Sequence, residues 1–305
     1  MYEFSAPMPF YKSLIINYLK INNETEKSKI TSLYFSLPKN SIDATGFEQA
    51  RYNWVKPKDF NYFKPLIEYS ISKGFNFIYL LNSPKTFISG FHNIDMHLEK
   101  LDRLLNNLRN VGCNKVRVCN PQIMGYLNEN YPDFELHLST SLEFQNIKQY
   151  SSIFNMFDNI KDFVPSFDLN KNFKFLKCIK NKFPNITIEL MINEGCISSC
   201  PLRNFHNVYS TDKFLNEGTK FFSNNFYLSK CMKYIEKNFF IYICKSNIIY
   251  TWEIKEYSKI GINNFKLVGR NCDNFSTPEY IKKYELYLKG IDNIKNIENI
   301  SILCF

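Results

Sequence analysis

Two cysteines in one short stretch are the strongest chemical signal in this sequence. Cys196 and Cys200 are separated by three residues in the polar segment 192–206, which reads INEGCISSCPLRNFH. An apolar run over residues 186–191 leads into this segment and predicts a buried strand. Parallel α/β folds keep their chemistry in the loops that follow the carboxyl ends of strands. We therefore expect this loop to supply two thiolates to an iron–sulfur cluster.

Further cysteines could complete the usual set of four thiolates. Cys231 and Cys244 come next, and they give the spacing Cys-x3-Cys-x30-Cys-x12-Cys within a cysteine-bearing region at 192–245. Cys244 follows an apolar run and could be packed in the core, which leaves Cys272, after the last predicted strand, as a rival fourth ligand. Cys119 or a non-cysteine group are further alternatives. Zinc is the alternative metal, although zinc sites more often use Cys-x2-Cys.

Four basic side chains are candidates to face a substrate. His206 follows the cysteine pair, and it could equally be a solvated loop histidine. His137 alternates with two leucines in a predicted strand, so it faces the inside of the sheet or its mouth. Lys266 lies within the last predicted strand and Arg270 just after it, where a guanidinium can bind an anion through two hydrogen bonds. The alternative for these two residues is an internal ion pair with a carboxylate such as Glu189.

Alternating predicted strands and helices position these residues. Strands are expected at residues 30–37, 75–81, 115–119, 134–139, 162–165, 186–191, 248–250 and 265–268. Helices are expected at residues 57–73, 96–111, 121–130, 143–150, 171–183, 226–237, 253–259 and 278–289. Gly74 follows the first of these helices, where a C-cap glycine is typical.

This alternation predicts an α/β fold with a parallel sheet, and eight repeats favour closure into a (β/α)8, TIM-barrel-like domain. An open doubly wound sheet is the alternative. We expect one domain over residues 1–305, with a helical extension at 1–28 and the cysteine-rich segment inserted after the sixth strand. The other isolated cysteines, Cys113, Cys178 and Cys304, are expected to be packing residues.

Composition limits the class of protein. The chain has 305 residues, of which 45% are hydrophobic and 17% aromatic, enough to fill a large core. The net charge of +9 permits an anionic partner such as RNA but does not indicate one. No run of 18 apolar residues predicts a membrane span, and the first residues do not resemble a secretory signal. Nine cysteines without regular spacing indicate a reducing, cytoplasmic setting rather than a disulfide framework.

Five stretches taken in order resemble the collagenase-like peptidases (family U32). The residues after the first long predicted helix resemble the second β–α unit of that family, and the others resemble its leucine-rich helix with an Asn-Pro strand end, its H-x-S-T strand, its cysteine loop and its F-K-L-x-G-R strand. These stretches are residues 74–82, 101–121, 137–141, 193–206 and 265–270.

The resemblance implies a (β/α)8-type barrel and, in many members, a [4Fe–4S] cluster held by four cysteines. It also implies proteolysis by the family name, whereas several branches resemble oxygen-independent hydroxylation systems that act on quinone precursors or RNA bases, some as pairs of homologous subunits. We therefore expect an iron–sulfur-dependent enzyme that modifies an RNA base, a quinone precursor or another small substrate. A peptidase acting on peptides and a non-catalytic iron–sulfur partner subunit are the alternatives. No nucleophile–base or zinc-protease motif supports the peptidase.

Overall fold

Eight parallel strands form a closed barrel in the computed structural model, and each strand lies beside its neighbour in the sequence. The last strand pairs with the first and closes the barrel. The strands are β1 (Tyr2–Pro7), β2 (Ser28–Phe35), β3 (Asn76–Leu81), β4 (Lys115–Val118), β5 (Glu135–Leu138), β6 (Ile160–Phe163), β7 (Thr187–Met191) and β8 (Asn264–Lys266). The structure describes residues 1–38, 41–48, 58–84, 94–209, 224–239, 241–242, 246–269 and 276–292. The predicted TIM-barrel-like fold is confirmed.

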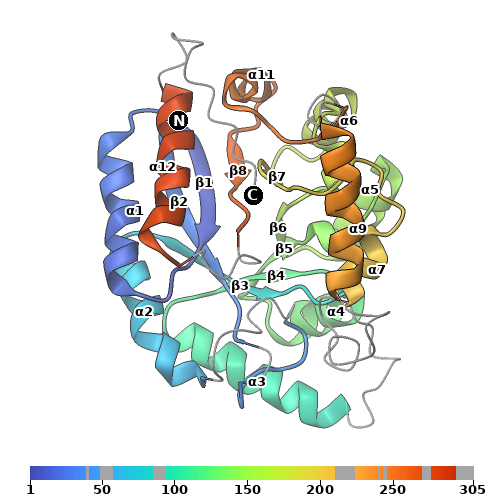
Figure 1. The fold of residues 1–305 in the computed structure, drawn as a ribbon. Coiled ribbons are helices and arrows are strands. Elements are labelled where there is room, and N and C mark those ends of the chain that lie inside the picture. Colours follow the sequence, from blue (N-terminus) through green and yellow to red (C-terminus); the bar gives the residue numbers. More distant parts are fainter. Residues whose placement is uncertain are drawn as a thin grey trace.

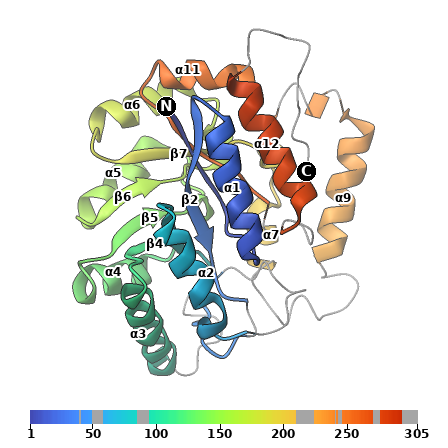
Figure 2. The same cartoon turned by 90° about the vertical axis from the view of Figure 1, so that its left-hand side faces the viewer.

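Helices surround the barrel (Figure 1). They are α1 (Lys12–Glu24), α2 (Phe60–Ser72), α3 (Ile94–Asn110), α4 (Pro121–Asn130), α5 (Ile147–Met156), α6 (Phe173–Lys182), α7 (Arg203–Tyr209), α9 (Asn224–Lys237), α11 (Ile254–Ser258) and α12 (Pro278–Asp292). Figure 2 shows α1 and α12 packed side by side, while α9 stands apart from the ring of helices and contacts α7. Of the helices that the structure describes, none has the length and apolar character needed to cross a membrane.

Local sequence explains why the helices form where they do. The leucines of α3 at positions 101, 104, 105 and 108 repeat with helical spacing, and all four are buried against the barrel. Pro121 opens α4, and the side chain of Asn120 caps it by accepting a hydrogen bond from the Gln122 amide at 2.9 Å. Gly74 has φ +85° directly after α2, as expected for a C-cap glycine.

The inside of the barrel combines apolar and charged side chains. Tyr34, Ile78 and Leu80 form a small buried cluster there, separate from the large core between strands and helices. Arg117 of β4 is 1% exposed, and it donates to Asp162 of β6 at 2.8 Å and to Glu189 of β7 at 2.5 Å. This buried guanidinium therefore joins three strands across the interior.

Three sequence-based expectations about the fold are wrong. Residues 1–28 are not only a helical extension, because Tyr2–Pro7 is β1, a full member of the barrel that pairs with both β2 and β8. Residues 248–250 are not a strand, since β7 already pairs directly with β8 and leaves no place between them. Consequently the cysteine loop follows the seventh strand and not the sixth.

Candidate functional site

The cysteine loop begins at the carboxyl end of β7 and is fixed to the end of β8. Asn193 Nδ2 donates to the Val268 carbonyl, and Asn193 Oδ1 accepts from the Val268 amide, both at 2.7 Å. The Ile249 amide donates to the Ile192 carbonyl at 2.9 Å, so a third segment covers the same strand end. These bonds hold the start of the loop in a defined place at the mouth of the barrel.

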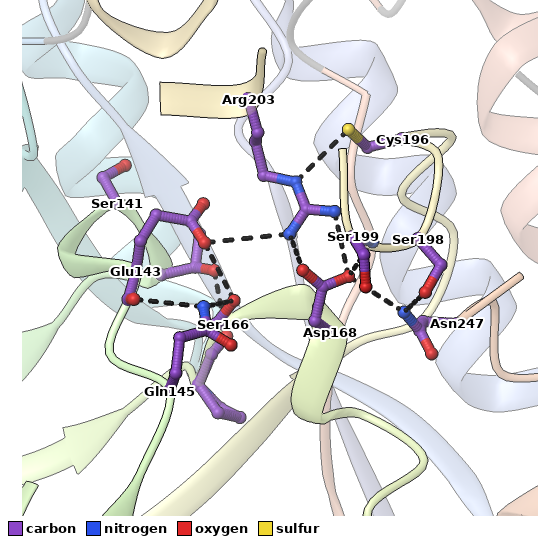
Figure 3. A network of polar contacts seen from close by, with 12 residues as sticks. Ser141, Glu143, Gln145, Ser166, Asp168, Cys196, Ser198, Ser199, Arg203 and Asn247 are labelled. Atoms are coloured by element: carbon purple, nitrogen blue, oxygen red, sulfur yellow. Dashed lines mark hydrogen bonds and ion pairs between the residues drawn. The ribbon is translucent and has the colours of Figure 1, made fainter. Parts of the chain in front are cut away.

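Arg203, the first residue of α7, lies at the centre of a polar network (Figure 3). Its terminal nitrogens donate to the two carboxylate oxygens of Asp168 at 2.8 and 3.0 Å. Nη2 also donates to the Ile197 carbonyl at 2.8 Å, and Nε donates to Sγ of Cys196 at 3.3 Å. The side chain is 10% exposed. One buried cation thus joins the segment after β6 to the cysteine loop after β7.

Asp168 is held by more than this ion pair. It lies in the short 3-10 helix η2 (Phe167–Leu169), directly after β6. Its Oδ1 accepts from the Ser199 amide at 2.8 Å and from Asn247 Nδ2 at 3.2 Å, and Asn247 Nδ2 also contacts Ser198 Oγ at 3.1 Å. Because the carboxylate is fixed by donors from two other segments, it fixes the orientation of the guanidinium.

A second carboxylate borders the network. Glu143 Oε2 accepts from Ser166 Oγ at 2.8 Å and lies 3.7 Å from Arg203 Nη1. Burial raises the pKa of Glu143. Glu143 has φ +50° and Ser199 has φ +54°, and no other non-glycine residue among those described has a positive φ. Such strain persists where the surroundings determine the conformation, and it is concentrated here in one network.

Cys196 is half-buried against an apolar cluster formed by Val164, Phe167, Met191 and Ile248. Burial raises the pKa of its thiol to about 12, although the nearby Arg203 opposes this shift. The thiol is therefore protonated at neutral pH in the metal-free protein. A metal that binds it must displace this proton, which makes binding dependent on pH.

Cys200 lies near enough to both Cys196 and Cys231 to affect the pKa of each of these two thiols. Burial raises the pKa of Cys231, on α9, and the charge of Cys200 adds to this shift. The charge of Cys200 also raises the pKa of Cys196. Independently of these shifts, α7, which follows the cysteine loop, packs against α9, which carries Cys231. Within the described ranges, however, no three His, Cys, Asp or Glu side chains surround one point as metal ligands would.

Four of the predicted site residues are not fully described. Cys244, Cys272 and Arg270 lie outside the described residues. His206 belongs to α7, but its side chain is likewise outside the description. The identity of the fourth thiolate and the two roles toward a substrate therefore stay predictions.

His137 and Lys266 lie inside the barrel. His137 is 7% exposed, and its Nδ1 is 3.3 Å from Asp162 Oδ1. Burial alone would lower the pKa of His137, but the charge of Asp162, together with hydrogen bonds to Asp162 and Glu135, raises it overall. Lys266 is 8% exposed, with Nζ 4.4 Å from the centre of the Tyr34 ring. His137 therefore points into the barrel, which is one of the two directions predicted for it. The roles toward a substrate predicted for His137 and Lys266 stay predictions.

Several contacts of the barrel interior and of the candidate site were not predicted. Glu189 is paired with Arg117 and not with Lys266, although Arg117 also stands between two apolar residues in a strand and so gave the same signal as Lys266. Asp168 had a weaker signal, as an acidic residue just past a strand end. The expected packing role of Cys178 is wrong because it is exposed on α6, whereas Cys113 is buried as expected.

Comparison with known families decides the relationship. The model of the family described as "Peptidase family U32" matches residues 85–301, more than two thirds of the chain. The chain belongs to peptidase family U32. The match includes the cysteine loop, α9 and β8, so the site described above lies within the U32 portion. A comparison with curated proteins found no match.

The solved structure of a U32 peptidase has a similar fold. The U32 peptidase Mk0906 matches with a TM-score of 0.56 at 12% identity, over 88% of this chain and 93% of that one. N-acetylneuraminate lyase from Mycoplasma synoviae matches with a TM-score of 0.44 at 10% identity, over 96% of this chain and 73% of that one. A domain of a thermostable chitinase from Pyrococcus furiosus matches with a TM-score of 0.45 at 8% identity, over 97% and 96% of the two chains. At such identities the likeness to the U32 structure concerns the fold alone.

Proposed function

We propose that this U32 protein is an iron–sulfur-dependent enzyme. In this proposal Cys196, Cys200 and Cys231 bind a [4Fe–4S] cluster, with Cys244 as the fourth ligand and Cys272 as its rival. The observation that supports it most is the contact between α7, which follows the loop of Cys196 and Cys200, and α9, which carries Cys231. Four converging thiolates are the usual requirement of such a cluster.

The chemistry of the surrounding residues fits a cluster. Thiolates placed against apolar side chains need compensation by hydrogen bonds or positive charge. Arg203 provides both, because its Nε–H points at the sulfur of Cys196 from a distance of 3.3 Å. A bound [4Fe–4S] cluster would supply electron transfer. A single zinc ion is the alternative occupant of the same thiolates.

The reaction we propose is oxygen-independent hydroxylation of an RNA base, a quinone precursor or another small substrate, by analogy with branches of family U32. The position of the cysteine loop at the carboxyl end of the barrel supports an enzymatic role, because barrel enzymes work at that face. His206 and Arg270 belong to segments that follow strands at this face, and they are our candidates for contacts with the substrate.

The test is the metal content of protein purified without oxygen. We expect a brown protein with about four iron atoms per chain, as four thiolates around one cluster require. Cys196→Ser should lose the colour and most of the iron. Cys178→Ser is the matched control, since Cys178 is exposed on α6, and it should keep both. Colourless protein that holds one zinc ion per chain would refute the cluster.

Proteolysis is the second candidate, and the name of the family favours it. Peptide cleavage by protein stripped of iron would support this reading. Cleavage that is found only in preparations that contain a contaminating protease would not support it. A chain that binds the cluster but turns over substrate only with a homologous subunit would instead be a partner subunit.

A further inference from the structure

We infer that Arg203 is a positioning residue that sets the reduction potential of the metal centre through a hydrogen bond to Cys196, and that Asp168 holds it in that position. This inference rests on the proposed iron–sulfur function. It concerns two residues that are not among the proposed cysteine ligands, and it assigns them a role in setting the reduction potential.

The geometry around the guanidinium carries the inference. Nη1 and Nη2 are both committed to Asp168, and Nη2 is also committed to the Ile197 carbonyl. The third nitrogen, Nε, donates its N–H to Cys196 Sγ at 3.3 Å (Figure 3). A planar guanidinium fixed at one edge in this way has no freedom to turn its Nε away from the sulfur. The contact is therefore built in before any metal binds.

The surroundings make the contact strong. Arg203 is 10% exposed on its side chain, and its carbon Cζ lies 5.8 Å from the centre of the Phe167 ring. Cys196 packs against the same apolar cluster that contains Phe167. A charge-assisted hydrogen bond in surroundings of low polarity acts more strongly than the same bond in water.

The direction of the effect follows from electrostatics. A reduced cluster carries one more negative charge than an oxidised cluster. A positive N–H donor beside a ligand sulfur stabilises the reduced form more, and such hydrogen bonds are among the factors that set cluster potentials. Removal of the Arg203 donor should therefore lower the reduction potential.

A simple structural role predicts something different. Arg203 also joins two loops, so its loss could loosen the fold without any direct effect on the sulfur. In that case thermal stability and iron retention would fall while the potential of the remaining cluster stayed unchanged. The potential is thus the measurement that separates the two roles.

The experiment is a spectroscopic redox titration of anaerobic full-length protein, with wild type, Arg203→Gln, Arg203→Lys and Asp168→Asn. We expect Arg203→Gln to lower the potential by at least the equivalent of a tenfold change in the one-electron equilibrium, which is 59 mV. Asp168→Asn should shift it in the same direction by less, because the donor remains but is no longer fixed. Arg203→Lys keeps the charge without the Nε donor, so its reduction potential should also lie between those of Arg203→Gln and wild type.

The matched control is Arg109→Gln. Arg109 also makes two hydrogen bonds to one carboxylate, from Nε and Nη2 to Asp133, both at 2.8 Å, but it lies on the exposed end of α3. The reduction potential of the Arg109→Gln variant should equal that of wild type. Brown Arg203 and Asp168 variants with unchanged potentials would overturn the inference and leave the cluster proposal intact. Wild-type protein without iron would overturn both, so the two failures are distinguishable.

Discussion

Removal of the buried guanidinium inside the barrel should destabilise the protein in a way that depends on pH. Arg117 is 1% exposed and pairs with Asp162 and Glu189. In Arg117→Met, Asp162 keeps His137 at 3.3 Å, whereas Glu189 loses the one ion-pair partner found for it among the described residues. One buried pair is therefore fully broken, which typically costs about 3–5 kcal/mol.

A second estimate, based on the protonation of Glu189, gives a similar loss of stability for Arg117→Met. The variant can avoid a buried unpaired charge by taking up a proton on Glu189. Protonating an ordinary glutamate at pH 7 costs about 3.7 kcal/mol, and this cost falls by about 1.4 kcal/mol for each pH unit. The native variant then binds one more proton than native wild type, while the unfolded chains bind the same number. The difference in free energy of unfolding between wild type and Arg117→Met should therefore narrow as the pH falls from 7 to 5.

The assay is urea unfolding followed by circular dichroism at pH 7 and pH 5. The double variant Arg117→Met/Glu189→Leu should recover most of the loss, because replacing both partners of a buried pair is often nearly neutral. Arg109→Met, on the surface, should have little effect. A loss below about 1 kcal/mol at pH 7, where about 3–5 is expected, or a gap that does not change with pH, would refute the account of the interior.

Two more predictions concern packing and a buried histidine. Gly269→Ala should destabilise the fold by about 1–3 kcal/mol, since a Cβ there would lie 2.4 Å from the hydroxyl of the buried Tyr284. The control Gly125→Ala should be neutral or stabilising, because a Cβ there meets nothing within 4 Å. Equal losses of stability in the two variants would contradict this prediction. Protonated His137 should stabilise the fold through Asp162, because its pKa is raised in the folded state. That contribution is present below pH about 6.5 and is lost as the pH rises through the folded pKa. The stability gap between wild type and His137→Asn, measured by urea unfolding, should therefore shrink from pH 6 to pH 9, and a gap that grows would contradict the sign.

Elements with strong local patterns were predicted closely from the sequence. The leucine spacing of α3 and the Asn-Pro start of α4 identify both helices, and the apolar run before the cysteine pair identifies β7. β1 was missed because Tyr2–Pro7 has no clear alternation, and it becomes a strand by pairing with β2 and β8. The partner β8 is more than 250 residues away, so no local pattern contains this information.

The residues of the candidate site likewise include some that a local pattern identifies and some that it does not. The cysteine pair could be found because its spacing and its place after a strand are local features. The bond between Arg203 and Asp168 joins residues 35 positions apart, and it exists because η2 and the cysteine loop meet at adjacent strand ends. The preference of a guanidinium for a carboxylate is general, so the sequence does not say which of the 29 acidic residues is the partner.

The most direct test of the central claim is anomalous X-ray diffraction at the iron edge from crystals grown without oxygen. The account predicts iron within about 2.3 Å of the sulfur atoms of Cys196, Cys200 and Cys231, by analogy with other metal–thiolate bonds. The same map would show whether Cys244 or Cys272 is the fourth ligand. Iron located elsewhere, or an iron-free site between the cysteine loop and α9 in freshly purified anaerobic protein, would contradict the claim.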